Sequence, residues 1–246
     1  TSVICVIIWL VSYIGGAANI SSNGNTLTIN QLTAKAVIDW QGFDIGAGET
    51  TNFAQPNGGI ALNRIHDIKP SQIDGKLTAN GNIMLINRNG MVFGKDSKVD
   101  VGGMLATTGD IGNDDFMHGN YRFNKAGNPN ARIVNNGVIT ARQGGGIALV
   151  APNVENNGTI NARLGKVQLG GADTFTLDMS GDGLIQYDVS HSLKDQSVNH
   201  SGKINAEGGI VSLTTAAADS VMDSSINISG DINVSNKTGQ GGAVIV

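Results

Sequence analysis

The stretch Val134-Asn135-Asn136-Gly137-Val138-Ile139-Thr140-Ala141-Arg142 recurs with few changes as Glu155-Asn156-Asn157-Gly158-Thr159-Ile160-Asn161-Ala162-Arg163. The two glycines are 21 positions apart, and each copy is followed by an apolar segment, residues 146–150 or 166–169. Within each copy apolar residues alternate with polar ones, as in a strand with one buried face. A repeat of about 20 residues, built of short strands and Gly-Asn turns, is typical of a β-solenoid.

The core of this repeat, Gly-x-apolar-[Thr/Asn]-[Ala/Val], is found along most of the chain. It begins at Gly75, Gly137, Gly158, Gly202 and Gly230, with a degenerate copy at Ser97. Leucine-rich repeats have a similar period, but their Leu/Asn signature is absent. In a parallel β-helix, strands of successive coils pair about 4.8 Å apart, and Gly or Asn accommodates the turns between faces. The sequence therefore predicts an all-β parallel β-helix.

The composition excludes several other classes of protein. Of 246 residues, 35 are glycine, 15% are charged and 4% are aromatic, so long helices are disfavoured. A hydrophobic content of 40% with little charge argues against disorder, and four prolines without a Gly-X-Y period argue against collagen. The net charge of −4 gives no electrostatic basis for binding nucleic acid, so no nucleic-acid partner is expected.

The amino terminus resembles the end of a secretory signal. Residues 3–14 are almost wholly apolar and uncharged, too few to span about 30 Å of hydrocarbon comfortably, and small residues follow up to Ala18. We expect residues 1–18 to be a signal peptide remnant, which contains Cys5, the only cysteine. Residues 19–246 would form the mature domain, continuing beyond 246 in the native protein. The alternative is that residues 3–14 form a buried strand.

Two segments interrupt the repeat. Residues 20–53 lack it and carry most of the large apolar side chains, so we expect them to cap the first coil, with Trp40 and Phe43 as anchors. Residues 109–132 combine polar residues with aromatic ones, including Phe116 and Phe123. They are expected to form a short external hairpin insertion on the outside of the rod.

An ordered series of segments carries a family resemblance: residues 37–46 (VIDWQGFDIG), 63–65 (NRI), 70–77 (PSQIDGKL) and 85–94 (LINRNGMVFG). Together they resemble the amino-terminal two-partner secretion (TPS) domain of filamentous-haemagglutinin and haemolysin-type exoproteins, the haemagglutination activity domain family. The resemblance implies a right-handed parallel β-helix with an amino-terminal cap. It also implies export through the Gram-negative periplasm and outer membrane by a TpsB-type outer-membrane transporter with POTRA domains.

The family motif Asn-Pro-Asn-Gly-Ile falls on Asn87, Arg88, Asn89, Gly90 and Met91, which makes these the candidate secretion motif. Arg88 replaces the proline and Met91 replaces the isoleucine. The segment 128–131 (NPNA) has letters similar to a second family motif, Asn-Pro-Asn-Leu, but it lies later in the chain, so its role is not transferred. The alternative interpretation of the motif, and of Trp40 and Phe43, is purely structural, as turn and core residues.

No catalytic, metal or cofactor site is predicted. Asp114-Asp115-x-x-His118 is more typical of a solvated loop than of a cation site. Polysaccharide-degrading β-helices need clustered carboxylates, and the nearest candidates are Asp173 and Asp178 beside Arg163 and Lys166.

The first hypothesis is therefore a secretion and folding-nucleation module of a large exported, virulence-associated adhesin or haemolysin-like protein. That protein would be secreted or held at the cell surface, with host-cell contacts through downstream regions. The alternatives are a carbohydrate-binding or adhesive β-helix surface and, less favoured, an enzyme.

Overall fold

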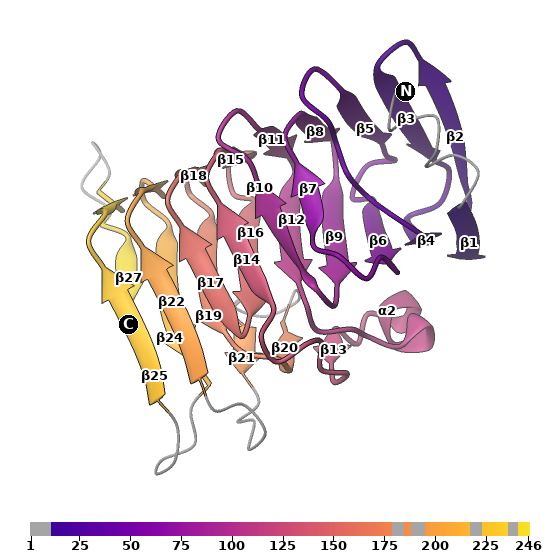
Figure 1. Ribbon diagram of the computed structural model, residues 1–246. Helices are drawn as coiled ribbons and strands as arrows, with labels where there is room; N and C mark the ends of the chain where they lie inside the picture. The colour runs from indigo at the N-terminus through magenta and orange to yellow at the C-terminus, as the bar shows by residue number, and fades with distance from the viewer. Residues whose placement is uncertain (1–10, 179–184, 188–194, 217–222, 236–240) are drawn as a thin grey trace.

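The computed structural model describes residues 11–178, 185–187, 195–216, 223–235 and 241–246. Three sheets run side by side along a rod from the amino-terminal end to the carboxy-terminal end (Figure 1). Apart from antiparallel pairs at the amino-terminal end, neighbouring strands of these three sheets pair in parallel, each with the equivalent strand of the next coil. The predicted all-β parallel β-helix is confirmed.

The first sheet contains, in spatial order, β1 (Val11–Gly15), β4 (Lys35–Trp40), β6 (Ile60–Ile65), β9 (Asn82–Asn87), β12 (Gly103–Thr107), β16 (Gly146–Ala151), β19 (Lys166–Gly171), β24 (Ile210–Thr215) and β27 (Ala243–Ile245). The second contains β2 (Ala18–Asn23), β3 (Thr26–Gln31), β5 (Thr50–Ala54), β8 (Lys76–Ala79), β11 (Lys98–Val101), β15 (Val138–Ala141), β18 (Thr159–Asn161), β23 (Lys203–Asn205) and β26 (Asp231–Asn233). The third contains β7 (Ser71–Ile73), β10 (Gly90–Phe93), β14 (Arg132–Asn135), β17 (Asn153–Asn156), β22 (Asp195–His200) and β25 (Asp223–Ile228).

The repeat motif forms the second sheet and the corner before it. Its apolar residue is buried and in register from coil to coil, as Leu77, Val99, Ile139, Ile160 and Ile204. Its glycine lies where two coils touch, because a Cβ on Gly158 would overlap the carbonyl oxygen of Gly137. The same holds for Gly202 against the carbonyl of Gly158. The recurring glycine is therefore a requirement of coil spacing.

A ladder of buried polar side chains ends the third sheet. The Asn135 amide donates to Asn156 Oδ1 at 2.7 Å, and Asn156 Nδ2 lies 3.0 Å from His200 Nδ1. Asn135 Oδ1 accepts the backbone N–H of Gly137, so the direction of the ladder is fixed at one end. His200 Nε2 also lies 3.1 Å from the Asp231 carbonyl oxygen. Because all three residues are at most 1% exposed, their side chains depend on such protein partners for hydrogen bonds.

We expect Asn156→Ala to lower the free energy of unfolding by about 1–3 kcal/mol, because it leaves two buried polar partners unsatisfied. The matched control is Asn157→Ala, whose side chain bonds Asn136 and Ser201 on the exposed side of the same turn. This change is expected to cost less than about 0.5 kcal/mol. Urea denaturation measures both values, and equal losses would contradict the role of the buried ladder.

The amino-terminal end is closed by antiparallel strands. β1 pairs with β4 and β2 pairs with β3, both antiparallel. Of the predicted cap over residues 20–53, only β2 has antiparallel pairing alone, because β3 also pairs in parallel with β5. β4 and β5 already pair in parallel with β6 and β8, and so belong to the first coils. Residues 1–10 lie outside the described residues. β1 falls within the predicted signal peptide of residues 1–18 and forms a strand, as in the alternative interpretation of residues 3–14, so the signal peptide stays a prediction.

The insertion over residues 109–132 is closed at its base by an antiparallel bridge between Asp110 and Lys125, but it does not continue from there as a regular two-stranded hairpin. It folds as the helix α2 (Asn113–His118) and the strand β13 (Arg122–Phe123). β13 pairs antiparallel with β20 (Phe175–Leu177), which in turn pairs with β21 (Ile185–Tyr187). The hairpin is therefore found only at the base of the insertion, and the strand partner of β13 comes from a second excursion about fifty residues later.

These excursions cover the outer face of the first sheet. Outward residues of that sheet, such as Leu62, Leu105 and Val150, are buried in a second hydrophobic cluster. Phe123 and Phe175 stack within it, with ring centroids 4.5 Å apart. The first sheet is therefore buried on both faces over part of its length, which explains why its strands are almost continuously apolar.

Candidate functional site

The candidate secretion motif forms the turn between β9 and β10. Asn87 ends β9 and is fully buried. Its Oδ1 accepts the backbone N–H of Asn89 at 2.9 Å, and its Nδ2 donates to the Ser71 hydroxyl and the Lys69 carbonyl. Asn87 therefore closes its own turn and also holds the start of the neighbouring coil.

The remaining motif residues each have a structural partner. The Asn89 amide donates to the Asp67 carbonyl at 2.9 Å. Gly90 has φ 101°, and a Cβ there would overlap the carbonyl oxygen of Arg132. Met91 is fully buried in the core of the rod. The structure of this turn alone therefore accounts for the pattern Asn-x-Asn-Gly-apolar, independently of any role in secretion.

A second turn of the same kind packs against the motif. The Asn128 N–H donates to the Arg88 carbonyl at 2.9 Å, and Asn128 Oδ1 accepts the Asn130 N–H at 3.0 Å. Arg88 itself is exposed and reaches the Ala126 carbonyl. In the sequence, this contact was indicated only by the Asn-x-Asn pattern that the two turns share. Because Asn128 lies within the insertion, its position next to Arg88 could not be predicted.

The two turns border a hollow on the surface of the rod. It has a volume of about 570 Å³ and is also lined by Arg64, His66 and Ile68. Arg64 is held by Asp39 and Asp110, with Nε 2.9 Å from Asp110 Oδ1. It also donates to the Ile111 carbonyl, and so ties the insertion to the first sheet.

The predicted cap anchors are core residues. Trp40 and Phe43 are at most 2% exposed and meet edge to face, with ring centroids 5.1 Å apart. The Trp40 indole N–H donates to Asn63 Oδ1 at 2.9 Å, which accounts for the asparagine of the Asn63-Arg64-Ile65 segment. Neither ring is available for contact with a partner in the folded domain.

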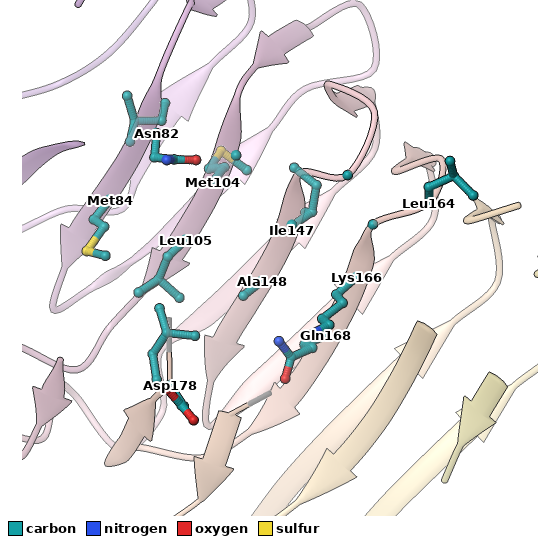
Figure 2. A pocket seen from close by; sticks show the side chains of 16 residues that line it. Asn82, Met84, Met104, Leu105, Ile147, Ala148, Leu164, Lys166, Gln168 and Asp178 are labelled. Atoms are coloured by element: carbon teal, nitrogen blue, oxygen red, sulfur yellow. The ribbon is translucent and has the colours of Figure 1, made fainter. Parts of the chain in front are cut away.

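The residues considered for catalysis do not form one cluster. Asp178 and Lys166 line the same groove on the first sheet (Figure 2). Asp173 is 4% exposed, and Arg163 lies 3.8 Å from Glu207. His118 contacts the Asp114 carbonyl through Nδ1. Over the described ranges, no group of three or more His, Cys, Asp or Glu side chains could hold a metal ion.

No helix in the described part of the chain is long and apolar enough to cross a membrane.

The parallel β-helix and the comparison with known families together define a class of protein, a β-helical secretion domain. A model of the TPS secretion domain family matches residues 13–245. The chain belongs to this family of TPS, or two-partner secretion, domains, whose general role is recognition by a TpsB transporter of the outer membrane.

Known relatives and a solved structure agree with this assignment. The chain is 33% identical over 205 residues to a heme/hemopexin-binding protein of Haemophilus influenzae strain Rd, an alignment that covers 76% of this chain and 21% of the relative. Identity to another H. influenzae heme/hemopexin-binding protein is 40% over 105 residues, or 42% of this chain and 11% of that protein. The crystal structure of the HMW1 secretion domain from H. influenzae superposes with a TM-score of 0.71 at 26% identity, covering 95% of this chain and 65% of that one. The chain thus spans about a fifth or less of the curated relatives that it matches.

Arg88 offers a test of the turn, because the motif that residues 87–91 resemble has proline at this position. The Arg88 N–H donates none of the hydrogen bonds found among the described residues, and Asn87 before it is extended, as proline requires. We expect Arg88→Pro to leave the free energy of unfolding unchanged or to raise it by about 0.4–1 kcal/mol.

The control is Asn89→Pro, which removes the N–H that donates to Asn87 and is expected to destabilise the domain. Urea denaturation gives both values. A loss of more than about 1 kcal/mol in Arg88→Pro would contradict the turn geometry described above.

Proposed function

We propose that this domain is recognised in its unfolded state by the POTRA domains of a TpsB-type outer-membrane transporter, and that it folds into the β-helix after passage. The observation that carries the proposal is the burial of the motif. Asn87 and Met91 are fully buried, and Gly90 is packed against the next coil. A transporter that reads these side chains can therefore reach them only before the coils close.

The architecture supports folding during export. Each coil pairs only with the coils next to it, so one coil can form as soon as its residues emerge. Every added coil buries further residues of the apolar stack, such as Ile160 over Ile139. Return of a folded coil into the pore would expose this surface again, which makes export directional.

The proposed route begins with a signal sequence over residues 1–18 and passes through the periplasm. The domain would emerge as the first folded part of a larger secreted or cell-surface protein. The relatives named for binding heme and hemopexin suggest a ligand-binding or adhesive activity for that larger protein, through regions beyond the part matched here. Adhesion through the β-helix surface itself is the alternative for this domain.

Export assays with and without the transporter test this proposal. The chain is fused to a complete signal sequence and expressed in a Gram-negative host, and its amounts in periplasm and medium are measured by immunoblot. We expect protein in the medium only when the cognate transporter is present. Equal release without the transporter, or retention in its presence, would contradict the proposal.

A matched pair of variants separates motif recognition from turn stability. Asn89→Ala and Asn130→Ala each alter the third residue of an Asn-x-Asn turn while keeping the backbone N–H that closes it. We expect Asn89→Ala to reduce export several-fold and Asn130→Ala to leave it unchanged. If both variants export alike, or if export only follows their stability in urea, the motif has no recognition role.

A further inference from the structure

The outer face of the first sheet carries a groove beside the two excursions (Figure 2). Its volume is about 230 Å³, and its apolar floor is formed by Met84, Leu105 and Ala148, each at most 6% exposed. Leu177 and Asp178 border it on the side of the excursions, and Leu164 and Lys166 border it elsewhere. We call this feature the outer groove.

The outer groove is elongated along the axis of the rod. Met84, Leu105, Ala148 and Gln168 are in register on four adjacent strands, so that their row measures about 14 Å at the usual strand spacing. The row beside it contains Gly103 and Gly146, which carry no side chain and so leave the hollow. A straight apolar chain fits such a channel better than a globular group does.

The wall residue Leu164 has a strained backbone. Its φ of 55° makes it the one non-glycine residue with positive φ among those described. In the neighbouring coils the equivalent position, directly before the stacked corner glycine, is Gly144 or Gly208, with φ 80° and 69°. A leucine is disfavoured in this conformation, and its side chain is 42% exposed rather than packed in the core. Such strain suggests a role other than stability.

Two charged side chains line the groove, and of these Asp178, at the border formed by the excursions, already has an interaction partner, which leaves Lys166 as the cation open to a ligand. Its ammonium makes no ion pair within the described part of the chain, while its neighbour Gln168 accepts the Ile185 N–H at 2.7 Å. Lys166 pairs with Gly146 and is the next residue in the row that contains Gly103 and Gly146. It therefore lies at the carboxy-terminal end of the channel. A linear apolar ligand in the channel would therefore meet a cation at this end.

We propose that the outer groove binds a medium-chain aliphatic carboxylate, that is, a fatty acid. Its hydrocarbon chain lies over Met84, Leu105 and Ala148, and its carboxylate pairs with Lys166. Leu164 covers the chain from the side. The apolar floor contributes affinity by removing the hydrocarbon from water, and the single cation selects an anionic head group.

Isothermal titration calorimetry with decanoate tests this site on the folded 246-residue chain. We expect saturable binding with one site per chain. Decylammonium, which has the same hydrocarbon chain and the opposite charge, is expected to bind at least tenfold more weakly. Absence of saturable decanoate binding, or equal binding of both probes, would overturn the proposal.

Two variants locate the binding. Gly146→Leu is expected to abolish it, because a Cβ at Gly146 meets nothing closer than 3.7 Å and the new side chain can fill the groove without disturbing the backbone. Lys166→Met is expected to weaken decanoate binding about tenfold. The control Lys98→Met, on the exposed side of β11, should bind like the unaltered chain. Unchanged binding in Gly146→Leu or Lys166→Met would place the ligand elsewhere.

A third variant separates binding from a structural role of Leu164. Leu164→Gly restores the residue of the neighbouring coils, and we expect several-fold weaker decanoate binding with a thermal midpoint no lower than that of the unaltered chain. Unaltered affinity would contradict the proposal, and so would a lowered midpoint, since it would show that Leu164 serves folding.

Discussion

The spacing between successive coils is the constraint on which the rest of the structure depends. Parallel strands pair about 4.8 Å apart, so the corners between sheets must also approach to this distance. At the corner before the second sheet, Gly137, Gly158 and Gly202 are stacked, and none of these three positions has room for a Cβ. This fixed spacing also brings Ile139 over Ile160 and joins Asn135 to Asn156. The core, the polar ladder and the glycine row therefore all follow from the spacing of the coils.

The same regularity explains what the sequence could predict. The alternation of apolar residues and the 21-residue interval between Gly137 and Gly158 depend on contacts between adjacent coils, which recur and are therefore visible in the sequence. The layer over the first sheet has no period, because Phe123 meets Phe175 only once. The sequence did contain an indication of this layer, because outward-facing positions of the first sheet, such as Leu105, are as apolar as inward-facing ones. That pattern indicates a sheet covered on both faces.

The candidate site was predicted in part. The motif from Asn87 to Met91 was identified by its letters, and the structure explains each residue as part of one turn. The contact of Arg88 with Asn128 was missed, because forty residues separate them and Asn128 lies within the insertion. The burial of the motif is also consistent with two successive roles for the same residues, first in recognition by the transporter and then in the folded coil. In the extended chain they are accessible to a transporter, and in the folded domain they close a coil.

The most direct test of the coil-spacing constraint is the free energy of unfolding of Gly158→Ala compared with Gly146→Ala, measured by urea denaturation. A Cβ at Gly158 overlaps the preceding coil, whereas a Cβ at Gly146 does not. We expect Gly158→Ala to lose about 1–3 kcal/mol or more, and Gly146→Ala to stay within about 1 kcal/mol of the unaltered chain. Equal stabilities of the two variants would contradict the central role of the glycine row.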